Sequence, residues 1–405
     1  MNIVAVYAED YPWDIRVEKL LVGFQNAGHT THLVCRNRAL RPANERVGNI
    51  LCKRVPAPVL PRALASLIST PAFFNPMWAA AVRRCIRDAR PELVVVRDLP
   101  LAPLAIRLAN SAGIAVSVDM AENHPALWRE VCASDPIPLR SWILKNPYLA
   151  RRMERSVARR AHGFFVVVEE MREHLLALGV PPERVAVVSN TPELMSFDAS
   201  GGSMPPDTFP PLSPHHVDLL YVGNVTRRRG LHQVVAAMAE LREDDPMPRL
   251  HVVGDGDYLP RLRELAAKMK LAGRVFFHGR IEFARVPAIF ARCHVGVISH
   301  LKTEHTDTTI PNKLFDCMAC AKPVLVSNAT PLERIVTAED CGRVFRDGDI
   351  AGIANQIRAL LDPELRRRLG ANGRSAVERR YNWGRDMETA LAAVQRFTRS
   401  PLSSR

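Results

Sequence analysis

Short apolar runs alternate with amphipathic stretches of helix length along the whole chain. The apolar runs lack a strict period of two, which favours strands that are buried on both faces. Such strands alternating with helices predict the doubly wound α/β class, with parallel sheets covered on both sides. The predicted strands are 2–8, 31–35, 93–96, 114–119, 164–168, 185–189, 218–223, 249–254, 274–278, 294–298, 323–327 and 342–345, and clear helical patterns cover 15–27, 101–112, 230–242 and 257–271.

One segment interrupts this pattern and divides the chain. Residues 196–215 hold five prolines and a Gly-Gly pair and show no periodicity, so we predict a linker there. The 405 residues then divide into an N-terminal domain over 1–195 and a second domain over 216–384. A last helical pattern over 385–405 is expected to pack back onto the first domain. We expect two Rossmann-like domains facing each other across a ligand-binding cleft.

The composition is that of a globular protein, with 47% hydrophobic and 24% charged residues. The eight cysteines are scattered, and only Cys317 and Cys320 are close, so no zinc set is formed. We therefore expect reduced core thiols in a cytoplasmic protein. Because a strand pattern begins at Asn2, we expect no signal peptide.

The positive charge suggests an anionic partner. Lys and Arg exceed Asp and Glu by 55 to 42, a net charge of +13. No nucleic-acid-binding signature is present, so nucleic acid is not the expected partner. The charge is concentrated in 140–160, where arginines and apolar residues alternate at helical spacing. Such a helix fits an anionic membrane at the inner face of the plasma membrane, and it equally fits a core-facing helix with a solvated arginine face.

Residues 63–82 form an uncharged stretch as long as a transmembrane helix. Pro71, Asn75 and Pro76 argue against a span, and a broken loop or a short helix pair, near a membrane surface or an acceptor pocket, is the better interpretation.

Residues 307–326, DTTIPNKLFDCMACAKPVLV, carry the strongest chemical signal. Pro311 suits the first turn of a helix, which leaves the amides of Asn312, Lys313 and Leu314 pointing outward at the positive end of the helix dipole. These amides and the Lys313 cation would hold a diphosphate, and Asp316 would accept hydrogen bonds from sugar hydroxyls. The alternative is an ordinary, well-capped helix.

Other strand ends carry weaker signals. A glycine turn at Gly223 leads into an Arg-rich loop, 226–230, which is a plausible anion pocket. The sequence Gly254-Asp255-Gly256-Asp257 is not a complete dinucleotide fingerprint. Its two aspartates could hold a metal ion, but a turn and a helix N-cap at Asp257 are favoured, and neither a metal nor another cofactor is expected.

Two further segments carry similarly weak signals of a ligand site. Residues 275–281 end a strand at Gly279, beside Arg280, where backbone groups could meet a nucleobase. Residues 299–309 are polar and without period, which suggests a mobile loop over a sugar; His300 and His305 have no third metal ligand nearby.

The order of these landmarks resembles the retaining GT-B glycosyltransferases of family 4, the glycosyl transferases group 1, over nearly the full length. The matching segments are YPWDIRVEKLLVGFQNAGHTTHLVCRN, VDMAEN, VVVEEMREHLLALGV, LLYVGN with RRRGL, HVVGDGD, VFFHGR and PNKLFDCMACAKPV. The resemblance implies transfer of a sugar from a nucleotide-diphosphate donor that is held mainly by the second domain.

The resemblance also implies site residues, with several departures from the family pattern. Arg229 takes the place of the cation that neutralises the diphosphate, whereas its usual partner arginine is Asn224 here. Asp316 falls on the second acid of the family's Glu-x7-Glu motif, and Thr308 replaces the first. In the first domain Ala121 replaces the histidine that meets the sugar, which leaves Glu122 and Asn123 as polar candidates.

We therefore predict three sets of residues. The catalytic set is Arg229, Lys313 and Glu122. The donor-binding set is Gly223, Asn224, Gly254, Asp255, Gly256, Arg280, Thr308, Pro311, Asn312, Leu314 and Asp316. The acceptor-binding set is Arg16, Asp119 and Asn123.

The predicted function is retaining transfer to a saccharide or lipid-linked acceptor in cell-envelope or exopolysaccharide synthesis. A nucleotide-sugar 2-epimerase of the same fold and a non-catalytic nucleotide-sugar binder remain alternatives. A nicotinamide-dependent oxidoreductase is weaker, because no strand is followed by a complete fingerprint.

Overall fold

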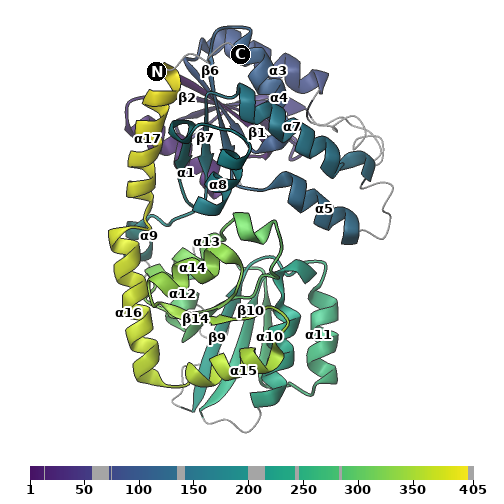
Figure 1. The fold of residues 1–405 in the computed structure, drawn as a ribbon, viewed down its shortest axis with the longest axis vertical. Coiled ribbons are helices and arrows are strands. Elements are labelled where there is room, and N and C mark those ends of the chain that lie inside the picture. The colour runs from purple at the N-terminus through teal and green to yellow at the C-terminus, as the bar shows by residue number, and fades with distance from the viewer. Residues whose placement is uncertain are drawn as a thin grey trace. The chain divides into compact units, whose positions relative to one another are not determined.

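The computed structural model describes residues 1–12, 14–56, 73, 75–134, 142–198, 215–241, 246–281 and 285–399. The chain forms two compact units, each built around one sheet (Figure 1). Unit 1 comprises Met1–Val188 and Asp386–Arg405, and unit 2 comprises Ser189–Arg385. Most of the predicted linker, 199–214, lies outside the described residues.

The sheet of unit 1 has eight strands in the order β3-β4-β2-β1-β5-β6-β7-β8. All neighbouring pairs are parallel except β3 and β4. The order reverses between β1 and β5, the topological switch point at which open α/β sheets bind ligands. The strands are β1 (Asn2–Asp10), β2 (Thr30–Asn37), β3 (Asn44–Val47), β4 (Ile50–Pro56), β5 (Leu93–Arg97), β6 (Ala115–Met120), β7 (Gly163–Val166) and β8 (Val185–Val187).

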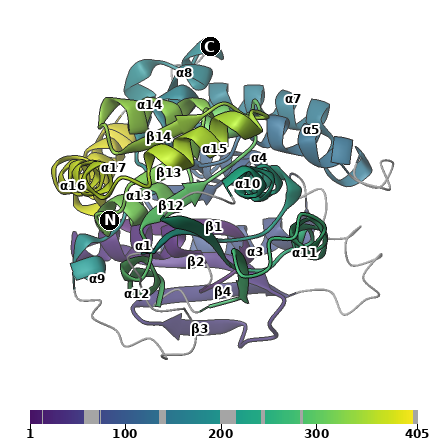
Figure 2. The same cartoon turned by 90° about the horizontal axis from the view of Figure 1, so that it is seen from below.

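The hairpin of β3 and β4 was not predicted from the sequence. It extends the edge of the sheet beyond β2 (Figure 2). Val47 pairs with Ile50 across a two-residue turn, and Gly48 there has a φ of 56°. Gly-Asn between two short β-prone runs is a hairpin signal. The polar and charged residues of β3 hid this signal, because an edge strand needs no buried face.

The helices of unit 1 cover both faces of its sheet. They are α1 (Ile15–Asn26), α3 (Pro76–Ala89), α4 (Ala102–Asn110), α5 (His124–Ser134), α7 (Pro147–Arg160), α8 (Glu169–Ala177) and part of α17 (Trp383–Arg399).

Part of the apolar stretch 63–82 forms the start of α3. The Asn75 side chain caps this helix by accepting hydrogen bonds from the amides of Met77 and Trp78. Trp78 is 2% exposed and therefore belongs to the core. Residues 63–72 lie outside the described part of the chain. Within that part, no helix combines the length and the apolar character needed to cross a bilayer.

Unit 2 has six strands, all parallel, in the order β11-β10-β9-β12-β13-β14. Here the switch point lies between β9 and β12. The strands are β9 (His216–Val222), β10 (Met247–Val253), β11 (Val275–Gly279), β12 (Val295–Ile298), β13 (Val324–Ser327) and β14 (Gly342–Phe345).

The helices of unit 2 bury one large apolar cluster. Val217, Leu219 and Tyr221 of β9 pack with Val234 and Ile353 in this cluster, all at most 1% exposed. The helices are α9 (Leu194–Asp198), α10 (Leu231–Met238), α11 (Leu259–Lys268), α12 (Val286–Ala291), α13 (Asn312–Ala319), α14 (Thr330–Ala338), α15 (Ile350–Ala359) and α16 (Pro363–Arg379).

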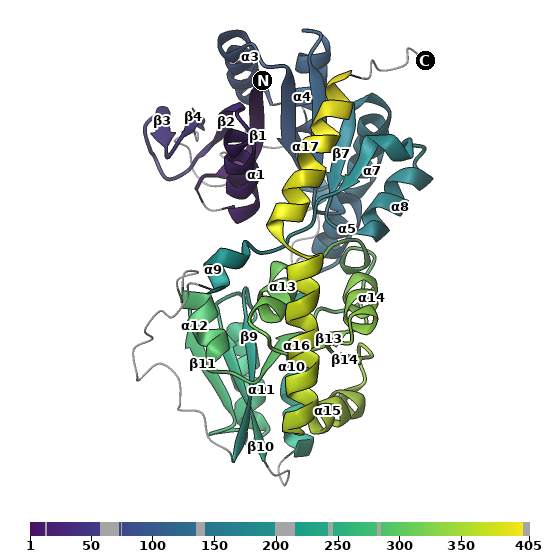
Figure 3. The same ribbon diagram turned by 90° about the vertical axis from the view of Figure 1, so that its left-hand side faces the viewer.

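Most of the last helix belongs to unit 1 (Figure 3). Phe397 of α17 is 1% exposed, and its ring centroid lies 5.6 Å from that of Phe165 in β7. A Cβ atom at Gly163 would lie 2.4 Å from the Phe397 ring, so only glycine leaves room for this ring.

We expect Phe397→Ala to destabilise unit 1 by about 3–5 kcal/mol, because it leaves a cavity against β7. Urea denaturation, followed by circular dichroism, would show an earlier transition. Arg396→Ala, at an exposed position on the same helix, is the matched control. Equal transitions for the two variants would contradict the packing of α17 on unit 1.

Candidate functional site

Two loops of unit 2 are joined at the carboxyl ends of β9 and β10. The amide of Gly223 donates to the carbonyl of Val253 over 2.9 Å, and the amide of Val225 donates to that of Asp255 over 2.8 Å. Gly254 has a φ of 139°, and a Cβ there would lie 1.9 Å from the Gly223 carbonyl oxygen. Glycine is therefore required for the close approach of the two loops.

Tyr221 stabilises this junction of the two loops with a hydrogen bond. Its hydroxyl donates to the Asn224 carbonyl over 2.7 Å, and burial raises the pKa of Tyr221 to about 12. The Asn224 side chain is exposed at the end of the loop.

Arg229 lies in a short 3-10 turn, Arg227–Arg229, that is fastened to the end of β12. The Ser299 hydroxyl donates to the Arg229 carbonyl over 2.7 Å. Gly230 follows with a φ of 69°, and a Cβ there would lie 1.8 Å from the Ser299 carbonyl oxygen. The turn is thus held against β12 at the switch point of the sheet.

His300 is the partner of the Arg229 guanidinium. Arg229 Nη1 lies 2.8 Å from Nε2 and 3.2 Å from Nδ1 of His300. A guanidinium only donates hydrogen bonds, so the imidazole must accept and must be neutral. Burial and the neighbouring Arg229 and Lys313 charges hold the pKa of His300 well below its usual value, in agreement with this geometry. His300 therefore positions Arg229 without neutralising it.

Lys313 brings a second cation to the same end of the sheet. Its Nζ lies 4.1 Å from the centre of the Tyr221 ring and would lie 3.0 Å from a Cβ atom at Gly223. Burial, followed by the Arg229 charge, lowers the pKa of Lys313 well below its usual value. Within the described part of the chain, neither Arg229 nor Lys313 forms an ion pair with a carboxylate.

Helix α13 begins at the predicted position, but only two of the three predicted free amides are free. Pro311 is the N-cap residue, and the Leu314 amide donates to its carbonyl over 3.2 Å. The prediction that Leu314 offers its amide to a ligand is therefore wrong, because a tight first turn uses this amide. Asn312 and Lys313 remain at the open end, and Asp316 is 7% exposed one turn further on.

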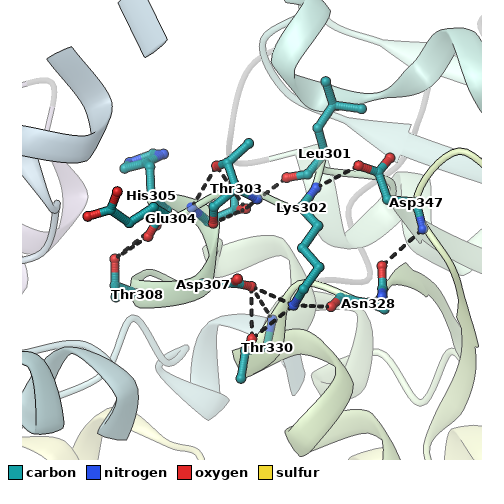
Figure 4. Close-up of polar contacts among 11 residues, drawn as sticks. Leu301, Lys302, Thr303, Glu304, His305, Asp307, Thr308, Asn328, Thr330 and Asp347 are labelled. Atoms are coloured by element: carbon teal, nitrogen blue, oxygen red, sulfur yellow. Dashed lines mark hydrogen bonds and ion pairs between the residues drawn. The ribbon is translucent and has the colours of Figure 1, made fainter. Parts of the chain in front are cut away.

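The loop between β12 and α13 is tied down by hydrogen bonds, contrary to the expectation of a mobile loop (Figure 4). Lys302 Nζ lies 3.0 Å from Asp307 Oδ1 and donates to the carbonyl of Asn328 over 2.9 Å. The Lys302 amide donates to Asp347 over 3.0 Å, and the Thr330 amide donates to Asp307 over 2.7 Å. The loop is thus joined to both α14 and the segment after β14.

Threonines order the inner part of the same loop. The Thr306 hydroxyl donates to the Leu301 carbonyl over 2.7 Å and accepts from the Thr303 amide over 2.8 Å. Thr308, predicted to contact the donor, uses its hydroxyl on the carbonyls of Glu304 and His305, both over 3.1 Å. In this structure Thr308 therefore stabilises the turn.

The other predicted donor residues lie at the exposed rim of unit 2. Asp255 and Asp257 are exposed, and Gly256 is half-buried between them. Asp257 is not the N-cap of α11, which begins at Leu259 after Tyr258, without a side-chain cap. Arg280 is exposed at the end of β11. The described residues contain no group of three or more side chains that could hold a metal ion.

Unit 1 holds a second charged cluster at the carboxyl ends of β5 and β6, and its charges are balanced. Arg16 Nη2 lies 2.6 Å from Asp119 Oδ1, and Arg97 Nη1 lies 3.1 Å from Asp119 Oδ2. Burial alone would raise the pKa of Asp119, but Arg16 and Arg97 lower it. Arg16 and Asp119 are only 4% and 1% exposed. The predicted acceptor contact is therefore replaced by a role in joining α1 to β6.

Asp98 extends this cluster toward the other acceptor candidates. Its Oδ1 accepts from the amides of Ala121 and Glu122, over 3.1 and 3.3 Å. Asn123 caps α5, because its Oδ1 accepts from the Ala126 amide over 3.1 Å. Asn123 is 1% exposed, and its Nδ2 has no hydrogen-bond partner among the described residues. Asn123 thus keeps a free donor next to Glu122.

A buried polar network on the sheet of unit 2 was not predicted. Asp218 Oδ1 lies 2.6 Å from Arg249 Nε and 3.1 Å from His251 Nε2, and His251 Nδ1 lies 3.0 Å from His278 Nε2. Burial would raise the pKa of Asp218, but hydrogen bonds from His251 and Arg249 lower it to about 2. Burial lowers the pKa of His294 to about 4. The only signal for this network in the sequence was that alternate residues of a strand face the same side of the sheet.

Two family models match most of the chain. The Glycosyl transferase 4-like domain matches residues 14–191, and Glycosyl transferases group 1 matches residues 212–376. Glycogen synthase of Mycobacterium tuberculosis is 27% identical over 181 residues, which are 44% of this chain and 42% of that protein. N-acetyl-alpha-D-glucosaminyl L-malate synthase of Bacillus anthracis is 24% identical over 164 residues, 40% of this chain and 41% of that protein. The matches thus span less than half the length of these curated relatives.

Solved structures with low sequence identity share the fold over the full length. Sucrose-phosphate synthase from Thermosynechococcus elongatus aligns with a TM-score of 0.76 at 20% identity, covering 99% of this chain and 100% of that one. HepE of Anabaena in complex with UDP aligns with a TM-score of 0.73 at 14% identity, covering 98% and 100%. The chain thus combines a Glycosyl transferase 4-like domain with a Glycosyl transferases group 1 domain on two parallel-sheet units, the GT-B fold that it shares with these solved structures.

Proposed function

We propose that this protein transfers a sugar from a nucleoside-diphosphate donor to a saccharide or lipid-linked acceptor, with retention of the anomeric configuration. The observation that supports this most is the pair of cations, Arg229 and Lys313, without a carboxylate partner at the switch point of unit 2. A diphosphate carries the negative charge that this pair of basic side chains lacks. The structure of HepE with UDP supports a ligand of this class, because that protein shares the fold.

In the proposed reaction the bond between the sugar's anomeric carbon and the diphosphate oxygen breaks, and its electron pair stays on the diphosphate. The acceptor hydroxyl forms the new bond on the same face and passes its proton to the leaving diphosphate. Negative charge grows on the diphosphate, so Arg229, Lys313 and the amides at the start of α13 stabilise the transition state more than the bound donor. No protein nucleophile and no metal ion is required.

The acceptor role is assigned to unit 1. Glu122 is half-buried at the carboxyl end of β6, whereas the neighbouring Asn123 is only 1% exposed. The Glu122 carboxylate can accept a hydrogen bond from an acceptor hydroxyl group and orient it. Cytoplasmic glycan synthesis for the cell envelope or an exopolysaccharide is the proposed setting.

Thermal unfolding with UDP, GDP or ADP tests the proposal directly. A diphosphate that binds the native state raises the melting temperature, and at about 100-fold excess over Kd it adds about 2.7 kcal/mol. Mass analysis after incubation with the matching sugar nucleotide, with NMR of the sugar to detect epimerisation, then distinguishes the reactions. A transferase or slow donor hydrolase releases the diphosphate, an epimerase keeps the donor mass, and a simple binder changes nothing. No stabilisation by any of the three would contradict the proposal.

Arg229→Ala is expected to lower kcat by about 10²–10³, the effect of losing one preorganised group that stabilises developing charge. Arg227→Ala, in the same turn but exposed, is the matched control and should keep its activity. Diphosphate release is the readout, with melting temperatures to confirm that both variants fold. An unchanged kcat in Arg229→Ala would remove the catalytic role from this residue.

Lys313 is expected to take up a proton when a nucleoside diphosphate binds. Its pKa is lowered in the empty protein, and a bound anion favours the ammonium form and raises this pKa again. Affinity should therefore fall as the pH rises through the pKa of the bound state.

Calorimetry in buffers with different ionisation enthalpies measures this proton uptake. Lys313→Met should lose it and bind about ten- to hundred-fold more weakly, the range for one charged hydrogen bond. Lys268→Met, at an exposed position on α11, is the control. Proton uptake that persists in Lys313→Met would assign it to another group.

A further inference from the structure

Helix α7 presents an exposed surface that carries only positive charge. Its five arginines, Arg151, Arg152, Arg155, Arg159 and Arg160, are all exposed. None of them forms an ion pair with a residue in the described part of the chain. The single acid of the helix, Glu154, has a 2% exposed side chain, and its Oε1 lies 3.1 Å from His174 Nε2. No carboxylate on the exposed face of this helix therefore offsets the arginines.

Four of the five arginines are arranged as one stripe. At 3.6 residues per turn, Tyr148, Arg151, Arg152, Arg155 and Arg159 fall within an arc of about 100° on one side of the helix. Ala150, Glu154, Val157 and Ala158, which are buried, lie on the opposite side. The stripe extends along about 16 Å of the helix. A flat anionic surface could contact all of these groups at once.

An apolar group lies at the N-terminal end of this stripe. Trp142, Ile143 and Tyr148 are 38%, 63% and 72% exposed, and they are three of the six large exposed hydrophobic residues in the described part of the chain. The rings of Trp142 and Tyr148 stack, with centroids 5.7 Å apart. Trp and Tyr favour the boundary between the head groups and the hydrocarbon of a bilayer, whereas arginine favours anionic head groups.

We propose that Trp142, Ile143 and Tyr148 together with the arginine stripe of α7 form a docking surface for an anionic lipid bilayer. The three apolar side chains would enter the head-group region, and the arginines would contact lipid phosphates. Nucleic acid and acidic polysaccharide fit less well, because neither accounts for an exposed Ile143 beside the stacked rings. The surface lies in unit 1, so it deepens the proposed function by bringing a lipid-linked acceptor to this protein.

Co-sedimentation of the full chain with vesicles tests this surface in the absence of donor and acceptor, so failure here leaves the transfer reaction untouched. We expect binding to vesicles of phosphatidylcholine and phosphatidylglycerol in equal parts, and little to phosphatidylcholine alone. Binding should weaken with added salt, since exposed charges are screened. Equal binding to both vesicle types, or none to the mixed vesicles, would overturn the proposal.

Two sets of variants separate the two halves of the surface. Replacing Arg151, Arg155 and Arg159 with Gln should weaken binding about five-fold for each arginine. Replacing Trp142, Ile143 and Tyr148 with Ser should also weaken binding, at unchanged net charge. The controls are Leu40→Ser, 77% exposed elsewhere in unit 1, and replacement of the exposed Arg83, Arg84 and Arg87 of α3 with Gln.

The controls and a competing polyanion complete the test. All replaced residues are exposed, and melting temperatures confirm that each variant folds. If the α3 control loses as much binding as the α7 variant, net charge alone explains the effect and the docking surface is wrong. The proposal would also be overturned by two results obtained together. In the first, the protein binds heparin or duplex DNA tightly, whether or not Trp142, Ile143 and Tyr148 are replaced with Ser. In the second, this Ser variant binds vesicles as well as the unchanged protein does, which would point to a soluble polyanion.

Discussion

Two basic side chains without a carboxylate partner are the constraint on which the proposed chemistry depends. Arg229 and Lys313 lie at the end of a parallel sheet, where burial makes an unpaired charge costly. The chain meets this cost in two ways. A neutral His300 accepts a hydrogen bond from Arg229, and the Tyr221 ring lies under Lys313. Both contacts hold a basic group in place while leaving it available to a ligand.

The two units show how one topology can serve opposite electrostatic purposes. In both sheets the order of the strands reverses near the middle, and charged residues gather at the carboxyl ends beside this point. In unit 1 the charges are balanced, because Arg97 lies near Asp14 and Asp98 as well as Asp119, which also pairs with Arg16. In the described part of unit 2, the carboxylates near the loop between β12 and α13 do not pair with Arg229 or Lys313. Asp307 pairs with the Lys302 side chain, and Asp347 accepts from the Lys302 amide. A balanced cluster joins elements firmly, whereas an unbalanced one is suited to bind an anion.

The loop between β12 and α13 is rigid because its Asp307 pairs with Lys302 and not with Arg229 or Lys313. Lys302, Asp307 and Thr330 form a closed set of hydrogen bonds, so the loop holds the start of α13 in place before any ligand arrives. Preorganised donors cost no reorganisation at the moment of reaction. The network on β9 and β10, centred on Asp218, stabilises the face of the sheet in a similar manner without touching the carboxyl edge.

Local sequence sufficed for every strand except β3 and β4, for helices such as α1, α4, α10 and α11, and for the start of α13, because hydrophobic period, capping residues and prolines act over a few neighbouring positions. It also identified Arg229 and Lys313 as cations at strand ends. It could not reveal that His300 accepts from Arg229, that Thr308 is used by its own turn, or that Arg16 is buried against Asp119. The pairs Arg229–His300 and Arg16–Asp119 join residues that are distant in the chain, and they depend on which side chains the sheet brings within a few ångströms. The contacts of Thr308 are local, but they depend on how the turn folds. The edge hairpin of β3 and β4 escaped for a related reason, since a strand without a buried face leaves little hydrophobic pattern to recognise.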